Sequence, residues 1–202
     1  MPHLMIVNGS QRPNAESSKV MGFIRRLAEQ RDGVACHLLD FTATRLPMWS
    51  DAPDAQAAQN AAWAPIQPQL RESLGLVLIA PEWNGMAPPA LKNFFLYCTE
   101  HELADRPAVI VGVSSGNGGA SPASELRLSS YKDTQICYLP EQVIVRRVRD
   151  VLNDPDQPVS EEDAYVRFRL DYALTLLLEY GKALAQVRAA DVRRFDILPF
   201  GM

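Results

Sequence analysis

Two short apolar runs in this chain end in small, polar, loop-forming residues. Residues 4–7 (LMIV) lead directly into residues 8–12 (NGSQR), and residues 76–80 (LVLIA) lead into residues 81–85 (PEWNG). Apolar runs of four to eight residues are typical of strands buried on both faces, as in a parallel sheet. In open parallel sheets, ligands bind just beyond the carboxyl ends of the strands. The two polar loops therefore lie where a ligand is expected.

The rest of the chain alternates strands with helices. Further strands are expected at 36–39, at 108–113 and within 142–145, and helices at about 17–30, 55–73, 89–97, 121–131 and 160–187. Ser17 or Ser18 is expected to cap the first helix, and Pro65 and Pro68 must interrupt the second. The sequence SEED at 160–163 resembles a capping box that opens the last helix. Such alternation indicates βαβ units and a parallel sheet.

Five strands joined by helices fit one particular α/β architecture. They predict a flavodoxin-like three-layer α/β/α sandwich around a five-stranded parallel sheet, in the order 2-1-3-4-5. In that order the switch point lies between the first and third strands. The loops at 9–18 and 81–86 should then be neighbours, with the loop at 114–119 next to them. Three polar loops are thus expected to share one rim of the sheet.

Composition limits the class of protein and of partner. At 202 residues the chain is most simply one domain, 1–202, with a C-terminal helix at about 160–187 and a tail at 188–202. A net charge of −4 offers no general attraction to nucleic acid. The longest apolar stretches fall far short of the ~20 residues that span a bilayer, and the apolar stretch near the start is too short for a signal peptide. We therefore expect a cytoplasmic protein that binds neither nucleic acid nor membrane.

Cysteine and histidine positions suggest no further site. The chain has three cysteines without CxxC spacing, Cys36, Cys98 and Cys137. They are expected to be reduced and buried, because free cysteine behaves as a small apolar residue. The three histidines lie far apart in the sequence, with neither HxH nor HExxH spacing. No metal site is expected.

The first loop has the composition of an anion-binding site. Gly9, Ser10, Arg12, Ser17 and Ser18 adjoin the expected start of a helix, where unpaired backbone N–H groups and the helix dipole favour negative charge. A guanidinium there can form a bidentate pair with a phosphate. The loop matches neither the GxGxxG nor the GxxxxGK[ST] pattern. The alternative is a simple turn with a solvated Arg12, but position and composition together favour phosphate binding.

The second loop is stiffened by prolines and broken by Gly85. Its backbone N–H groups suit the polar edge of a planar heterocycle, and Trp83 adds an aromatic face. Taken alone, the segment is more simply a turn with an exposed tryptophan. Glu82 could act as a general base, but we expect it to fix the loop or to contact a partner subunit.

Together these segments resemble the NADPH-dependent FMN reductase family over about the first 130 residues. The resemblance is carried by GSxR at 9–12 with Ser17, and most specifically by PEWNGxxP at 81–88 followed by LKN at 91–93. It implies an oxidoreductase that passes hydride from NADPH (or NADH) to FMN and on to an acceptor such as a quinone, an azo compound or free flavin. The chemistry then belongs to the cofactor, and no catalytic side chain is expected.

The resemblance also implies roles for single residues. Ser10, Arg12 and Ser17 would hold the FMN phosphate, residues 81–85 would contact the isoalloxazine ring, and the stretch at 115–119 would cover another edge of it. The predicted cofactor-binding residues are Gly9, Ser10, Arg12, Ser17, Ser18, Pro81, Glu82, Trp83, Asn84, Gly85, Ser115, Gly116 and Gly118. Two positions depart from the family pattern. Trp83 replaces the usual tyrosine, and Ala15 stands where serine is common, which removes one phosphate hydrogen bond.

Two other functions fit the same fold. A flavodoxin-type electron carrier would bind FMN without a site for NADPH, but such carriers usually have a phosphate loop rich in Thr, Ser and Gly, where this chain has Arg12. A flavin-free interaction protein would keep the fold and lose the chemistry, because fold does not imply function.

Several residues are open to two interpretations. Met48 and Trp49 either border the pocket of a partner subunit or anchor their loop to the core. The cluster of Arg146, Arg147 and Arg149 either meets the 2′-phosphate of NADPH or, more simply, is a solvated run of charge. The apolar face of the last helix is wider than one stripe, which favours a subunit interface. A homodimer or homotetramer is therefore expected.

Overall fold

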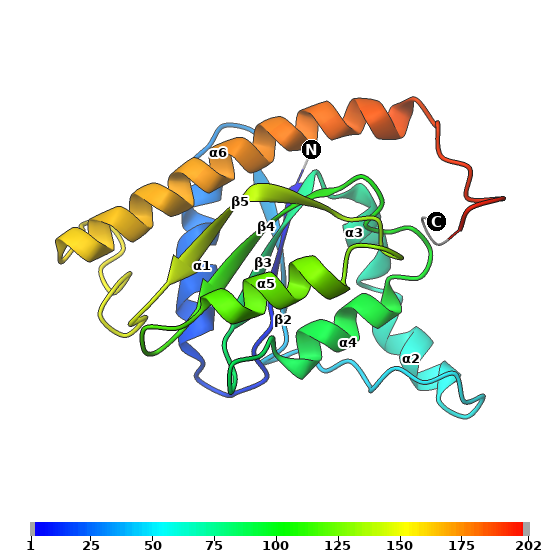
Figure 1. Cartoon of the computed structure of the whole chain (residues 1–202), viewed down its shortest axis with the longest axis horizontal. Coiled ribbons are helices and arrows are strands. Elements are labelled where there is room, and N and C mark those ends of the chain that lie inside the picture. Colours follow the sequence, from blue (N-terminus) through cyan, green and yellow to red (C-terminus); the bar gives the residue numbers. More distant parts are fainter. Residues whose placement is uncertain (1–2, 200–202) are drawn as a thin grey trace.

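The computed structural model describes residues 3–199, and its centre is a five-stranded parallel sheet (Figure 1). The strands are β1 (His3–Asn8), β2 (Ala35–Asp40), β3 (Gly75–Pro81), β4 (Pro107–Val113) and β5 (Cys137–Val145). Neighbouring strands all pair in parallel, in the order β2-β1-β3-β4-β5. This confirms the predicted flavodoxin-like topology.

Helices cover both faces of the sheet. Within the described residues they are α1 (Glu16–Glu29), α2 (Gln56–Trp63), α3 (Gln67–Glu72), α4 (Pro89–Tyr97), α5 (Ala120–Ser129) and α6 (Glu161–Ala189). α1 and α6 pack on one face, and α2 to α5 lie on the other (Figure 1). Pro65 falls between α2 and α3, and Pro68 lies in the first turn of α3, so the expected helix at 55–73 is divided as predicted.

The central strands are apolar on both sides because each side faces a separate core. All seven residues of β3 are buried. Val77 and Ile79 belong to the core under α1 and α6, whereas Leu76, Leu78 and Ala80 belong to the core under the other helices. Uninterrupted apolar runs are therefore the sequence signature of these strands.

Two predicted element boundaries were wrong. The N-cap of α1 is Ala15, not Ser17 or Ser18, because the helix begins at Glu16 and both serines lie inside its first turn. β5 begins at Cys137, five residues before the predicted strand within 142–145. The prediction failed there because Pro140 interrupts the apolar pattern. An edge strand tolerates a proline, and the pairing with β4 is irregular at this point.

Cysteine burial also differs from the prediction. Only Cys98 is buried, whereas Cys36 and Cys137 are half-buried because they lie on the two edge strands; all three are free thiols. The last helix agrees with the predicted 160–187, but residues 200–202 of the predicted tail lie outside the described residues. From residue 3 to residue 199, no helix combines the length and the apolar character that crossing a membrane requires.

Candidate functional site

The loops that follow β1, β3 and β4 gather at one rim of the sheet, as the strand order predicts (Figure 1). They enclose a cavity of about 150 Å³, called the rim cavity below. The predicted site residues that line it are Ser10, Arg12, Ser17, Pro81, Glu82, Trp83 and Ser115. The remaining predicted residues do not line the cavity but belong to the same loops or to the first turn of α1: Gly9, Ser18, Asn84, Gly85, Gly116 and Gly118.

A buried asparagine fixes the first loop. Asn8 is fully buried at the end of β1, and its Oδ1 accepts a hydrogen bond from the Ser10 backbone N–H at 3.3 Å. Its Nδ2 donates to Ser18 Oγ at 3.1 Å and to Asp40 Oδ1 at 2.9 Å. The Ser18 hydroxyl is therefore engaged in holding the loop.

Gly9 brings this loop against the neighbouring strand. Its N–H donates to the carbonyl oxygen of Ile79 at 2.9 Å. A Cβ at this position would lie 3.0 Å from that oxygen and 3.1 Å from Leu91 Cβ. Any larger residue would push the loop away from β3, so Gly9 shapes the cavity by its lack of a side chain.

The start of α1 presents hydrogen-bond donors to the rim cavity. Ala15 caps the helix with extended backbone and no side-chain hydrogen bond. The Ser18 N–H donates to the Ala15 carbonyl oxygen at 2.9 Å, so the N–H groups of Glu16 and Ser17 are the ones available to a ligand. The Ser17 hydroxyl is 2% exposed and finds no hydrogen-bond partner within residues 3–199. A buried polar group without a partner costs about 1–3 kcal/mol. This end of the cavity is therefore built for an acceptor that the chain does not supply.

The segment after β3 forms a tight turn. Trp83 and Met86 exchange backbone hydrogen bonds of 3.0 and 2.9 Å. Asn84 and Gly85 between them both have positive φ values, 51° and 79°. These values define a type I′ turn, for which Asn-Gly is the strongest sequence signal. That signal was available in the sequence, although the segment was predicted only as a stiff loop.

Glu82 connects the second loop to the third. Its backbone N–H donates to the carbonyl oxygen of Val113 at 2.8 Å, and its carboxylate accepts a hydrogen bond from the Gly119 N–H. A Cβ at Gly118 would lie 2.5 Å from Glu82 Oε2, so a larger residue there would require this carboxylate to move. The contacts of Glu82 are those of a residue that fixes a loop.

A second, larger hollow adjoins the turn. This apolar hollow of about 540 Å³ is lined by Met48, Trp83, Asn84, Met86, Ala87, Pro89, Lys92, Asn93, Leu96 and Glu125. Met48, Met86 and Leu96 are 71%, 53% and 50% exposed, so Met48 does not anchor its loop to the core. Trp83 lines both the hollow and the rim cavity.

A carboxylate anchors the segment that follows the turn. Glu125 Oε2 accepts a hydrogen bond from the Ala87 N–H at 2.7 Å, and Lys92 lies 3.0 Å from Oε1. The Ala87 hydrogen bond, aided by Lys92, holds the pKa of Glu125 below its ordinary value. The carboxylate thus remains charged and keeps the start of α4 in place beside the turn.

The rim cavity contains one cationic residue that the sequence analysis did not assign to it. Arg149, with Val148, reaches the cavity wall from the loop after β5. The sequence analysis placed Arg149 in a cluster that either meets the 2′-phosphate of NADPH or, more simply, is solvated, and no local pattern assigns it to this cavity. Its place depends on contacts between segments more than 100 residues apart.

Comparisons with known proteins agree with this geometry. A family model described as NADPH-dependent FMN reductase matches residues 2–150. The fold is similar to that of FerB, a flavoenzyme NAD(P)H:(acceptor) oxidoreductase from Paracoccus denitrificans, with a TM-score of 0.71 and 21% identity over 91% of this chain and 98% of that chain. It is also similar to an oxidoreductase from Corynebacterium diphtheriae, with a TM-score of 0.65 and 15% identity over 92% and 98% of the two chains. An azoreductase from Bacillus anthracis matches with a TM-score of 0.59 and 16% identity over 89% and 100% of the two chains. Among curated protein sequences no significant match is found.

Proposed function

Because this chain belongs to the NADPH-dependent FMN reductase family, and is accordingly an oxidoreductase that uses FMN with NAD(P)H as co-substrate, we propose that the rim cavity and the turn beside it are its FMN site. The observation that carries the proposal is the buried Ser17 hydroxyl at the start of α1, which has no partner within residues 3–199. A phosphate oxygen would accept a hydrogen bond from this hydroxyl. The residues present therefore fit FMN.

At the phosphate end of the site, we assign the anionic tail of FMN to Ser10, Arg12, Ser17 and the first N–H groups of α1. Ser10 Oγ already accepts a hydrogen bond from the Arg12 backbone N–H at 3.2 Å, which leaves its proton free to donate. The helix dipole and the Arg12 guanidinium add positive charge. Gly9 and Ser18 support this end from behind.

At the ring end, we assign the isoalloxazine to residues 81–85 and to the edge of the 115–119 loop. Pro81 and Trp83 supply apolar surface, and the Asn84-Gly85 turn presents its backbone at the rim. Glu82 holds the third loop through Gly119, and this link positions Ser115, Gly116 and Gly118 beside the ring.

FMN, when bound, supplies the chemistry of accepting hydride from NAD(P)H and passing electrons to an acceptor. The chain's own residues bind the phosphate, orient the ring and exclude water. Trp83 shields the cavity from the apolar hollow, and Glu82 keeps the two ring-side loops at a fixed separation. No side chain has to donate or remove a proton.

We propose small, planar acceptors such as quinones, azo compounds or free flavin. The apolar hollow next to Trp83 offers apolar surface that suits such molecules. Structurally similar proteins include an NAD(P)H:(acceptor) oxidoreductase and an azoreductase, which supports this range.

We further propose that a second copy of the chain covers the apolar hollow, giving a homodimer, or a homotetramer if another face also pairs. Exposed apolar side chains around one hollow mark an interaction surface, and self-pairing about a two-fold axis is the commonest way to cover one. The outward face of α6, with Tyr165, Phe168 and Tyr172 at 58%, 63% and 46% exposure, is the second surface. Sedimentation of the Leu96→Glu variant should show monomers where the unmodified chain shows dimers.

A cytoplasmic location is part of the same proposal. The three free cysteines fit a reducing compartment, and the NAD(P)H co-substrate fits it as well. Cell fractionation with an antibody against the chain tests this assignment.

The visible spectrum tests cofactor and activity together. The purified protein is mixed with FMN, freed of excess flavin and then treated with NADPH without oxygen. We expect retained flavin absorbance that bleaches within seconds, faster than free FMN at the same concentration. A bound flavin that stays oxidised would indicate an electron carrier, and a protein that retains no flavin would overturn the proposed site.

A further inference from the structure

Arg149 reaches the phosphate end of the rim cavity from a part of the chain that lies outside the family motifs. The loop between β5 and α6 brings Val148 and Arg149 to the same cavity wall as Arg12 and Ser17. The motifs that carry the family resemblance end well before this loop, although the family match over residues 2–150 includes Arg149. No motif therefore points to Arg149, and its assignment rests on the lining of the cavity.

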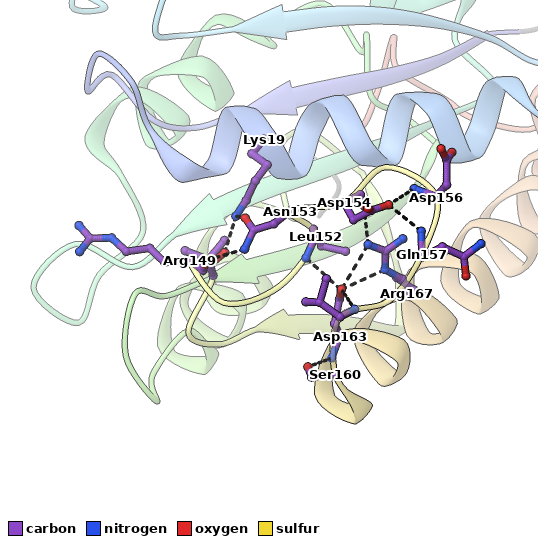
Figure 2. Close-up of polar contacts among 12 residues, drawn as sticks. Lys19, Arg149, Leu152, Asn153, Asp154, Asp156, Gln157, Ser160, Asp163 and Arg167 are labelled. Atoms are coloured by element: carbon purple, nitrogen blue, oxygen red, sulfur yellow. Dashed lines mark hydrogen bonds and ion pairs between the residues drawn. The ribbon is translucent and has the colours of Figure 1, made fainter.

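The three arginines of this loop differ in what they contact. Arg146 Nε donates to the Asn117 carbonyl oxygen at 2.8 Å, and the Arg147 guanidinium pairs with Glu162. Arg149 is exposed, and within residues 3–199 its guanidinium has no hydrogen-bond or ion-pair partner. Its side chain extends away from the polar contacts around Asp163 (Figure 2). Of the three, Arg149 is the one available to a ligand.

Two contacts tie the backbone of Arg149 to α1. Lys19 Nζ donates to the Val148 carbonyl oxygen at 2.6 Å and to Asn153 Oδ1 at 2.7 Å (Figure 2). Asn153 Nδ2 in turn donates to the Arg149 carbonyl oxygen at 2.7 Å. Because Lys19 lies on the first turn of α1, these bonds fix the distance between Arg149 and the helix start that lines the cavity.

The far end of the same loop is held by a buried carboxylate. Asp163 is fully buried and accepts hydrogen bonds from the backbone N–H groups of Leu152 at 2.9 Å and Val159 at 3.0 Å. Arg167 Nε lies 3.0 Å from Asp163 Oδ1, and its Nη2 donates to the Asp154 carbonyl oxygen at 2.5 Å (Figure 2). The loop is thus ordered before any ligand arrives, which reduces the entropy cost of using Arg149.

Within residues 3–199, the two arginines of the cavity lining are free of acidic partners. Of the two acidic residues there, Glu16 lies 3.2 Å from Lys19 Nζ, and Glu82 keeps its charge but is held on the ring side by the Gly119 N–H. Arg12 and Arg149 remain as two cations beside a helix start. A phosphate monoester carries about 1.5–2 negative charges near pH 7, so it matches two guanidinium groups better than one.

We propose that Arg149 is a second phosphate-binding arginine, which with Arg12 holds the phosphate of FMN and makes this chain select FMN over riboflavin. The inference rests on the proposed FMN site. Arg149 then adds a cation from the β5–α6 loop to the phosphate end. The Lys19–Asn153 and Asp163–Arg167 contacts position this cation by holding the loop.

The test compares Arg149→Gln with Arg147→Gln, which removes the same charge from the same loop but outside the cavity. Dissociation constants for FMN and riboflavin are measured by flavin fluorescence quenching on the purified protein, residues 1–202. We expect Arg149→Gln to weaken FMN binding about tenfold, the lower range for a hydrogen bond to a charged group at an exposed residue. Riboflavin binding should not change, and Arg147→Gln should leave both constants unchanged. Asn153→Ala, which keeps the Arg149 side chain but releases its backbone, should give a smaller loss for FMN alone.

Other outcomes overturn the inference. Unchanged FMN affinity in Arg149→Gln would do so, as would an equal loss for riboflavin, which would indicate a general disturbance of the site. A change only in the preference for NADPH over NADH would assign Arg149 to the 2′-phosphate of NADPH instead. If the unmodified chain binds FMN no better than riboflavin, the phosphate end of the proposed site itself fails, which is a different result from an effect missing only in the Arg149 variant.

Discussion

The two ends of the proposed FMN site are built in different ways. At the phosphate end, Asn8, Ser10 and Ser17 are 0%, 1% and 2% exposed, and the loop is fixed by hydrogen bonds within the chain. At the ring end, the tip of the turn at Asn84 and Gly85 is exposed. A single chain therefore encloses the phosphate end of the proposed site, but it leaves the ring end open to solvent. The missing cover at the ring end is what a second subunit would supply.

The largest expected effect concerns Asp163, which holds the β5–α6 loop that carries Arg149. Asp163→Asn removes the buried ion pair with Arg167, and we expect the free energy of unfolding to fall by about 3 kcal/mol. Urea unfolding at neutral pH measures this change. Met86→Ala at the exposed ring-end turn is the control, and it should change stability little. Equal losses for both variants would abolish the distinction between a pre-ordered end and an open one.

The same carboxylate makes a prediction about acid. Burial alone would raise the pKa of Asp163, but hydrogen bonds from Arg167, Leu152 and Val159 outweigh burial and hold the pKa below the ordinary value of 3.8. A lowered pKa means that the carboxylate stabilises the fold at neutral pH, and that this contribution is lost as the pH falls below 3.8. The stability difference between the unmodified chain and Asp163→Asn should therefore shrink in that acid range. A difference that stays constant would contradict the assignment.

Arg12→Ala tests the phosphate end alone, because FMN carries the phosphate and riboflavin does not. Loss of a charge-assisted hydrogen bond of roughly 1.5–3 kcal/mol should weaken FMN binding about ten- to a hundredfold. Riboflavin, which lacks the phosphate, should bind as before, and activity should recover at high FMN. Fluorescence titration with both flavins measures this. Equal FMN affinity in the variant and the unmodified chain would reject the phosphate role of Arg12.

Gly118→Ala should affect both flavins alike. The new Cβ would meet Glu82 Oε2 at 2.5 Å, so the carboxylate must move and its hydrogen bond to Gly119 is lost. We expect about tenfold weaker binding of FMN and of riboflavin, the value of one charge-assisted hydrogen bond. Glu82→Gln, which keeps an acceptor for the Gly119 N–H, is the matched control. A loss confined to FMN would show that this loop serves the phosphate end.

The smallest effect is expected at Ser17, where loss of the hydroxyl should leave stability equal or higher but lower the affinity for FMN. Ser17→Ala removes a buried hydroxyl without a partner, so the FMN-free chain should be equally stable or more stable by up to about 1 kcal/mol. FMN affinity should fall about fivefold, because a hydrogen bond to the phosphate is lost. Ser10→Ala is the comparison, since Ser10 Oγ accepts from the Arg12 N–H and its loss should destabilise the free chain. Lower stability in both variants would mean that the Ser17 hydroxyl has a structural partner.

Sequence reasoning predicted the features that local patterns encode. The apolar runs marked β1, β3 and β4, and their order followed from the alternation of strands and helices, which placed the three loops on one rim. The start of β5 was missed because Pro140 breaks its pattern and an edge strand needs no continuous apolar run. The sequence analysis considered a turn at Gly85, but it did not use the Asn84-Gly85 pair, a local signal, to predict the type of turn.

What depends on distant contacts could not be predicted. Arg149 belongs to the cavity because Lys19 and Asn153, 134 positions apart, meet behind it. α1 begins at Glu16 after the N-cap Ala15, which makes no side-chain hydrogen bond, and the buried Ser17 hydroxyl has no partner within residues 3–199. In both cases the property arises from how segments pack, and the sequence gives the residue type without its surroundings.

Trp83 borders the rim cavity and the apolar hollow at once. In the proposed dimer, FMN would lie on one side of the Trp83 indole and a second subunit on the other, so the two binding events would be thermodynamically linked, and the linkage would be reciprocal. If dimer formation strengthens FMN binding by some factor, FMN binding must strengthen dimer formation by the same factor. Dilution of the protein should then loosen its flavin, and removal of the flavin should loosen the dimer by the same factor.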